Sequence, residues 1–528
     1  MRGILFIFII SIVSVSCVSV KKYNTNLNKL RSEKDLKSDV DFAYRKLQKL
    51  HPDLYWYISK KELGFKFDSL KSTIKSPMTS NDFFLKLSPV IASVKEGHMR
   101  LIPLSRKLTK KERINSQKFG LNPFVRFDFE LFNNKLYINK NYSGDSSIKA
   151  GTELVSVDNT SPVELISKYS HTFASDGFNK TFIYRKSAKA FPQFFYYEYD
   201  VIDSVSCQLK YNDSLRTVYL KRNINKASSI KEKPDLKSKT EREIEKEKSK
   251  KEVLKRKLQG YDRITKTYSK NLSFREPDSS IAIMKINDFA KGRYAKFYQN
   301  SFRKMDSLKT KALIIDLRDN PGGRLNEIHN LYSYLTDKDF NFLDKSEVVS
   351  RTSLLHNNYF RRGPVAIVLM LPAELIYSAI VFLKVKKGDD KKFYFSWTST
   401  RSGHPKPENF KGKVFVLING GSFSASSLIS SNLKGSGRAI FAGEETGGAY
   451  NGTVAGMLPM LRLPKSKLNI RLGLARLTPF YKTDIDGRGI FPDIEIKPTL
   501  EDMITGNDPE LKTVLNEIKT GIYEKQNK

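Results

Sequence analysis

The sequence predicts an α/β protein, because three patterns follow one another along the chain. Apolar residues at helical spacing dominate residues 34–116, and short alternating stretches dominate residues 118–222. From residue 278 onward, apolar strands alternate with helices. With 528 residues the chain is too long for one hydrophobic core, so several domains are expected. Its 39% of hydrophobic residues excludes a wholly disordered protein.

The segment 1–17 predicts an export signal. Arg2 precedes the apolar run 3–15, and Ser16-Cys17 closes it, which resembles a bacterial lipoprotein signal with Cys17 as the lipidated residue. The alternatives are an ordinary cleaved signal and an uncleaved anchor helix. We therefore expect a protein of the cell envelope, lipid-anchored and facing the periplasm, with the outer membrane as its expected site. Export argues against nucleic acid as a partner, although the formal net charge is +36.

Two domains are expected ahead of the core. Residues 30–117 predict a helical domain, in which Thr79 starts a helix that runs out near Glu96-Gly-His98. Residues 118–222 predict a small β-rich domain separated into strands by turn signals. Within it, residues 148–166 resemble the strand, turn and helix of PDZ domains.

Two further segments need an interpretation. Residues 223–275 form a charged insertion in which Glu247/Lys251 and Glu252/Arg256 are paired at i,i+4. This pattern predicts a solvated helix or helical hairpin that acts as a linker. The alternative is an arm that binds anionic surfaces. Residues 365–383 are apolar, but Pro372 and Glu374 at their centre argue against a membrane span. We expect a buried strand there, a break at Pro372, and then a core helix.

The core domain, residues 276–505, is followed by a tail at 506–528. Buried strands are predicted at 280–286, 312–316, 414–418 and 438–442. Polar, glycine-rich turns follow the last three of them: Asp-Leu-Arg-Asp-Asn-Pro-Gly-Gly (316–323), Asn-Gly-Gly-Ser-Phe-Ser-Ala-Ser-Ser (419–427) and Gly-Glu-Glu-Thr-Gly-Gly (443–448). Such turns present backbone N–H groups to a ligand or a developing anion, although each alone also fits an ordinary strand-to-helix turn.

In this order and spacing, the three turns resemble the tail-specific, or C-terminal processing, serine proteases, with the tricorn core peptidase as a relative. The resemblance covers residues 280–500 well and 34–222 more loosely. It implies a ClpP/crotonase-like protease core, a PDZ-like domain ahead of it, and peptide or unfolded protein as substrate. It implies no metal and no cofactor.

The resemblance assigns Ser424 as the nucleophile, since this serine directly precedes Ala425 in Ser-Ala-Ser. The amides of Ala425 and of Gly322 or Gly323 match the oxyanion hole. The other serines of the turn, Ser422, Ser426 and Ser427, lie off that position. Classical members pair the serine with a lysine, but Ala449 occupies that place and no lysine follows until position 465.

The tricorn-like branch supplies a histidine base and an orienting acid instead. Lys95-Glu-Gly-His-Met-Arg100 resembles its Asp-Gly-His-Thr segment, which implies His98 as the base. The segment 486–493 resembles its Glu-x-x-Gly-Val-x-Pro-Asp segment, which places Asp486 as the acid, with Asp484 and Glu445 as alternatives. An acid hydrogen-bonded to the base fixes its tautomer.

We therefore expect an exported serine endopeptidase that acts through an acyl-enzyme. The missing lysine motivates an alternative, a catalytically inactive peptide-binding lipoprotein on the same fold. A third possibility is an envelope adhesin whose basic surface holds anionic polymers in a salt-sensitive manner.

Overall fold

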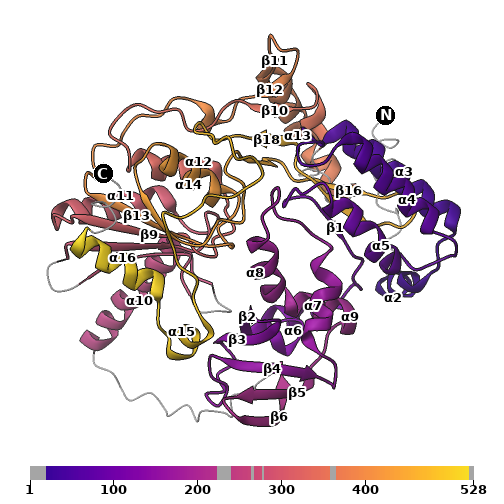
Figure 1. Cartoon of the computed structure of the whole chain (residues 1–528), viewed down its shortest axis with the longest axis horizontal. Helices are drawn as coiled ribbons and strands as arrows, with labels where there is room; N and C mark the ends of the chain where they lie inside the picture. The colour runs from indigo at the N-terminus through magenta and orange to yellow at the C-terminus, as the bar shows by residue number, and fades with distance from the viewer. Residues whose placement is uncertain (1–18, 223–238, 263–266, 276–278, 357–363, 522–528) are drawn as a thin grey trace.

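The computed structural model describes residues 19–222, 239–262, 267–275, 279–356 and 364–521. The predicted signal and Cys17 lie outside these residues. Figure 1 shows three regions: indigo helices from the start of the chain, a magenta β-sheet with helices, and a mixed α/β region that runs from red to yellow. The fold is thus a mixed α/β one, as the sequence predicts.

The N-terminal region is helical and ends in the loop that carries His98. Its helices are α2 (Val20–Thr25), α3 (Glu33–Leu50), α4 (Lys60–Thr73) and α5 (Ser80–Ala92), with η1 (Asn26–Asn28) between the first two. Thr79 starts α5 through a capping box with Asp82, which confirms the predicted helix start. The strand β1 (Arg100–Ile102) follows His98 at once.

The next region is a five-stranded antiparallel sheet with helices packed on it. The strands lie in the order β2 (Phe127–Phe132), β3 (Lys135–Asn141), β4 (Thr152–Val157), β5 (Ser204–Tyr211) and β6 (Ser214–Lys221). The helices are α6 (Lys110–Phe119), η2 (Pro123–Arg126), α7 (Pro162–Ser170), α8 (Thr181–Lys189) and α9 (Phe191–Tyr199). The last two helices, inserted between β4 and β5, were not predicted from the sequence.

The core is a six-stranded sheet that is parallel except at one edge. Its order is β19 (Ile494–Glu495), β14 (Ile440–Gly443), β13 (Lys413–Ile418), β9 (Ala312–Asp316), β8 (Ile281–Ile286) and the antiparallel β7 (Lys270–Phe274). This sheet confirms the four predicted strands. Side chains alternate between its two faces, so each face needs a cover of helices.

Helices cover both faces of the core sheet (Figure 1). One face packs on α11 (Tyr294–Ser307), α12 (Leu325–Ser333) and α14 (Ala425–Gly435). The other face packs on α16 (Pro509–Thr520), which follows α15 (Leu500–Thr505). Because β9, β13 and β14 are parallel neighbours, their carboxyl ends lie together, and the three glycine-rich turns meet at one edge of the sheet.

Two small sheets accompany the core, and the first of them joins it to the N-terminal region. In the first, β1 pairs with β17 (Asn469–Arg471), which also pairs with β16 (Met460–Arg462). This pairing fixes the His98 loop against the C-terminal half of the chain. The second sheet has the order β11 (Val385–Lys387), β12 (Phe393–Phe395), β10 (Ser346–Val348), β18 (Ala475–Leu477) and β15 (Thr453–Ala455). Short helical turns η3 (Ser353–His356) and η4 (Thr398–Thr400) complete the described elements.

The structure corrects the interpretation of residues 365–383. They form one helix, α13 (Pro364–Lys384), with no strand and no break at Pro372, and many of its apolar side chains are exposed. Within the charged insertion, α10 (Lys239–Gln259) is a helix with Glu247–Lys251 and Glu252–Arg256 ion pairs, as predicted. No helix among the described residues is long and apolar enough to cross a membrane.

Candidate active site

Ser424 lies on a sharp turn between a strand and a helix. β13 ends at Ile418 and α14 begins at Ala425, and Ser424 between them has φ 58° and ψ −119°. Positive φ is costly for a residue with a Cβ, and such strain clusters at functional sites. The Ser424 side chain makes no capping hydrogen bond to α14. Its hydroxyl is therefore available at the positive end of a helix.

The neighbouring serines have structural roles or none. The Ser422 hydroxyl donates to the Leu317 carbonyl, and the Ser427 hydroxyl donates to the Ser422 carbonyl. The Ser426 hydroxyl is buried without a partner in the described part of the chain. These bonds hold the turn in shape and leave Ser424 as the serine that faces a base.

The structure brings His98 to Ser424 across 326 positions of the sequence. His98 Nε2 lies 3.0 Å from Ser424 Oγ. The imidazole is buried and rests against the Phe423 ring, with 4.9 Å between centroids. The residue expected from the sequence to act as base thus lies within hydrogen-bond distance of the expected nucleophile.

The second ring nitrogen of His98, Nδ1, lies beside a hydroxyl and a buried carboxylate. Thr453 Oγ1 lies 3.0 Å from His98 Nδ1 and donates to Glu96 Oε1 at 2.9 Å. Since a hydroxyl has one proton and gives it to Glu96, its oxygen accepts from the imidazole Nδ1–H. This arrangement leaves Nε2 as the acceptor for the Ser424 hydroxyl. Glu96 Oε1 itself lies 3.6 Å from His98 Nδ1.

A second carboxyl, Asp176, lies beside Glu96. Asp176 Oδ1 accepts from the Gly97 N–H at 2.8 Å, and Glu96 Oε2 accepts from the Val454 N–H at 3.0 Å. Burial raises the pKa of both acids, and the neighbouring Glu96 charge raises that of Asp176 further, well above its usual range. The hydrogen bonds from Thr453 and Val454 favour ionisation of Glu96. Of the two acids, Glu96 is therefore the one whose contacts favour the charged form, and Asp176 is the one whose pKa is raised more strongly.

His98 is held neutral. Burial is the main cause that lowers its pKa to about 4; Arg471 and Lys186 act in the same direction, and Asp176 opposes them. Arg471 lies directly opposite Arg100 in the β1–β17 pair, so positive charge gathers on this side of the loop. A neutral imidazole is the form that accepts a proton from a hydroxyl.

Glu96, His98 and Asp176 also have the donor types of a metal site, with candidate ligand atoms within 4.8 Å of one another. Their hydrogen bonds indicate another use. Both Glu96 oxygens accept from Thr453 and Val454, and both His98 nitrogens face hydroxyl groups. This cluster fits a network that orients the imidazole better than it fits a set of free metal ligands.

The turn after β9 lies directly on the Ser424 turn. A Cβ on Gly322, whose φ is +95°, would lie 2.7 Å from Ala425 N, Phe423 O and Ser424 Cβ, so only glycine fits there. The Gly322 N–H donates to Asn320 Oδ1 at 2.9 Å. Among the described residues, no hydrogen bond engages the amides of Gly323 and Ala425. These two amides are the better candidates for an oxyanion hole.

Asp486 does not orient the histidine in this structure, and that expectation is corrected. Its Oδ2 accepts from Trp56 Nε1 at 2.6 Å, and its Oδ1 accepts from Asn451 Nδ2 at 3.1 Å. The segment instead supports the loop that carries Asp176, since the Phe178 N–H donates to the Gly487 carbonyl at 2.7 Å. The carboxylate beside the base is Glu96.

The two alternatives for the acid lie elsewhere too. Glu445 accepts two hydrogen bonds from Arg488, at 2.9 and 2.7 Å, and one from the Gly489 N–H. Asp484 is exposed in the loop before Asp486. Neither contacts the imidazole.

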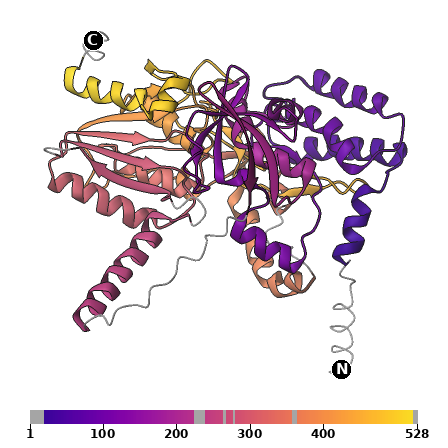
Figure 2. The same cartoon turned by 90° about the horizontal axis from the view of Figure 1, so that it is seen from below.

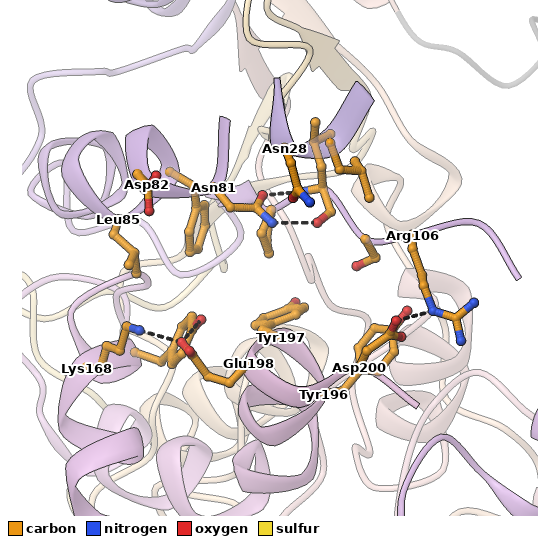
Figure 3. A pocket seen from close by; sticks show the side chains of 16 residues that line it. Asn28, Asn81, Asp82, Leu85, Arg106, Lys168, Tyr196, Tyr197, Glu198 and Asp200 are labelled. Carbon is orange, nitrogen blue, oxygen red and sulfur yellow. Dashed lines mark hydrogen bonds and ion pairs between the residues drawn. The ribbon is translucent and has the colours of Figure 1, made fainter. Parts of the chain in front are cut away.

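A polar cleft of about 250 Å³ lies between α5 and α9 (Figure 3). Its charged groups are already paired: Lys168 with Glu198, and Arg106 with Asp200. Asn81 reaches the Leu104 carbonyl across the upper wall. The Arg106–Asp200 pair joins the helical region to the β-rich region, and these pairings occupy the charged groups of both walls.

Comparisons with known proteins find similarity to peptidases in the core region. Residues 280–496 match the model of peptidase family S41. A carboxy-terminal-processing protease of Bartonella bacilliformis is 29% identical over 210 residues, which are 39% of this chain and 36% of that protein. The match thus spans little more than a third of that relative's length.

Solved structures extend the similarity of fold to nearly the whole chain. Mature CPAF complexed with lactacystin has a TM-score of 0.59 at 14% identity, covering 93% of this chain and 99% of that one. Mature CPAF has a TM-score of 0.56 at 15% identity, covering 92% and 96%. At such identities the likeness concerns the fold alone. Residues 280–496, which are less than half of the chain, are thus similar to peptidase family S41, in keeping with the resemblance of the sequence to tail-specific proteases.

Proposed function

We propose that the protein is a serine endopeptidase of the tail-specific type, with Ser424 as nucleophile and His98 as base. The observation that carries the proposal is the 3.0 Å contact between Ser424 Oγ and His98 Nε2. It joins a strained serine turn to an imidazole that is buried and neutral. This combination is what acyl transfer requires of a nucleophile and its base.

The proposed reaction follows from the hydrogen bonds. His98 Nε2 takes the Ser424 proton while Oγ attacks a peptide carbonyl carbon. The Ala425 and Gly323 amides receive the developing oxyanion. The imidazolium is stabilised through Thr453 by the Glu96 charge, and it returns its proton to the leaving amine. Water then releases the acyl group from Ser424 by the same steps.

Two finer features of the fold belong to the same proposal. The core sheet with its helices would be of the ClpP/crotonase type, and residues 118–222 would be a PDZ-like domain that binds an extended peptide or unfolded protein. Supporting this, α7 and α8 help to line an apolar cavity of about 860 Å³ that includes Ile166, Phe173 and Phe178. The cavity borders the loop that supplies Asp176, so an occupant would contact the support of the catalytic base.

We further propose that the protein is exported and held in the envelope by a lipid on Cys17, facing the periplasm. The support is the order of the segment 1–17, in which a basic residue, an apolar run and Ser-Cys follow one another. Peptide or unfolded protein substrates would then meet the active site outside the cytoplasm.

The direct test is fluorophosphonate labelling of a chain that begins at Ser19, with the modified residue located by mass spectrometry. We expect one phosphonylated residue, Ser424, and hydrolysis of unfolded protein that the probe abolishes. A properly folded protein that neither labels nor cleaves would favour the inactive peptide-binding lipoprotein. Salt-sensitive polymer binding by an unlabelled protein would favour the adhesin.

The pKa of His98 predicts the pH dependence of labelling. Since the pKa is lowered to about 4, the imidazole stays neutral as the pH falls through the ordinary histidine range. The labelling rate should therefore hold from neutral pH to about pH 5 and decline toward pH 4, rather than halve near about pH 6.5. Labelling reactions stopped at fixed times across this range measure the pH midpoint of the labelling rate. Circular dichroism at each pH excludes unfolding. A midpoint near that of a free histidine would contradict a buried neutral base.

Thr453 should matter through its hydroxyl. Thr453→Val keeps the shape but removes the acceptor for the imidazole Nδ1–H and the donor to Glu96, so the labelling rate should fall roughly 10- to 100-fold. Thr453→Ser keeps the hydroxyl and should retain most of the rate. Equal rates for the valine and serine variants would show that the hydroxyl does not position His98.

A further inference from the structure

The outward face of α13 is apolar and uncovered in the described structure. Leu375 and Ile376 are each 63% exposed, and Leu369 and Leu383 are exposed still further. Additional exposed apolar side chains on the helix are Met370, Leu371, Ile380 and Phe382. A contiguous apolar surface of this kind marks a site of contact with another apolar body.

The orientation of α13 is fixed by its inner face. Val381 is buried, and the Tyr377 hydroxyl donates to the Leu354 carbonyl at 3.1 Å and lies 2.9 Å from Met457 Sδ. Glu374, one turn before Ser378 and two before Val381, lies on the same half-buried stripe. The only acidic residue of the helix is thus directed toward the protein, and the apolar residues are left facing outward.

The geometry of α13 suits a helix that lies on a membrane rather than one that crosses it. Its 21 residues are about 31 Å long at 1.5 Å per residue. Tyr377 and Val381, one turn apart in its C-terminal half, attach it to the protein and oppose its leaving to span a bilayer. A helix that is packed on protein along one side and apolar on the other can lie in the plane of the interface.

Basic side chains follow the apolar face directly. Lys384, Lys386 and Lys387 are exposed at its C-terminal end, and none of them forms an ion pair within the described structure. Asp389 and Asp390 in the following turn are close to these lysines in the sequence. Asp390 accepts a hydrogen bond from the Tyr394 hydroxyl at 2.6 Å. Lysines beside an apolar surface favour contact with anionic headgroups.

The same side of the molecule carries α2, the first helix that the structure describes. Figure 2 shows α2, in indigo, and α13, in salmon, projecting from the lower side together with the magenta-red α10. Exposed lysines of α10, such as Lys250 and Lys255, add positive charge there. Ser19, which caps α2, follows closely after Cys17 in the sequence. A lipid on Cys17 would therefore hold this side toward the membrane.

We propose that α13 is a second, peripheral membrane anchor: its apolar face inserts into the headgroup region of an anionic bilayer, and the lysines that follow it bind the headgroups. Self-association through the same face is disfavoured because each copy carries a formal net charge of +36, which repels a second copy and attracts an anionic surface. This inference does not depend on the proposed peptidase activity.

The test uses the chain that begins at Ser19, which keeps every described residue and lacks Cys17. Flotation with vesicles of phosphatidylcholine and phosphatidylglycerol in equal parts, or of phosphatidylcholine alone, measures binding. We expect binding to the mixed vesicles at least about tenfold stronger than to the neutral ones, and weakened by salt. Leu375→Glu should reduce binding to the mixed vesicles at least about tenfold, and Lys386→Glu with Lys387→Glu should reduce it several-fold.

The matched control is Leu215→Glu, at an apolar residue of β6 that is 58% exposed and lies outside α13. It should bind vesicles like the wild type. Thermal melting followed by circular dichroism verifies that each variant is folded. Binding unchanged by Leu375→Glu would overturn the proposal, and so would a wild type that ignores anionic vesicles. A wild-type dimer by light scattering that Leu375→Glu dissociates, without vesicle binding, would assign the face to a second copy instead.

Discussion

Ser424→Ala is expected to abolish fluorophosphonate labelling, and His98→Ala to slow it by about 10⁴-fold while leaving the fold intact. Ser424 supplies the oxygen that forms the bond to phosphorus as fluoride leaves. His98 Nε2, at 3.0 Å, is the group placed to take its proton. The same variants should lose hydrolysis of unfolded protein to the same extents, since both reactions begin with this attack.

Matched controls distinguish a specific effect from damage to the site. Ser426→Ala removes a buried hydroxyl that has no partner in the described structure, two positions from the nucleophile, and should label normally. His171→Ala removes an exposed imidazole of the β-rich region and should also label normally. Labelling retained in Ser424→Ala would reject the nucleophile. Labelling retained in His98→Ala alone would mean that another group takes the proton.

The part of the site that could be predicted from the sequence is the part built by local patterns. Apolar runs identified the strands, and parallel pairing then brought the turns at 316–323, 419–427 and 443–448 to one sheet edge. Ser424 was assigned through the resemblance of the three turns to a protease family, since a serine before a helix start is by itself also typical of an ordinary helix cap. The position of His98 followed from the resemblance of its short segment to that of a known branch.

The acid could not be predicted in the same way, because its role depends on contacts between distant segments. Thr453 is 355 residues from His98, and Asp176 is 79 residues from Gly97. No local pattern marks either residue. Asp486 matched a local motif, but the fold uses that segment to support the Asp176 loop. Whether a carboxylate faces the base is decided by the packing of three regions of the chain.

The interpretation of α13 failed for a related reason. An apolar run has the same composition whether it is covered by protein or by lipid, and Pro372 suggested a break that the helix does not show. Only the three-dimensional structure shows that Val381 is buried while Leu375 faces outward.

Replacing Glu96 should slow labelling by about 10²- to 10⁴-fold, whereas replacing Asp486 should change the rate by no more than about threefold. In the proposed mechanism Glu96 stabilises the imidazolium, through Thr453 Oγ1 at 2.9 Å and at 3.6 Å from His98 Nδ1. Asp486 is exposed and bonds Trp56 and Asn451. Second-order labelling rates of Glu96→Gln and Asp486→Asn, which keep the size of each side chain, make the comparison.

The glutamine variant isolates charge from shape. Its amide oxygen can still accept from Thr453, but its NH2 group cannot accept from the Val454 N–H, so thermal melting is the control for folding. Glu96→Asp, which restores the charge one methylene farther away, should recover part of the lost rate. A large loss in Asp486→Asn with little in Glu96→Gln would instead assign the orienting role to the C-terminal segment. The expected order, with Glu96 dominant, means that this chain carries its orienting acid close to its base in the sequence, on a loop held in place by Asp176.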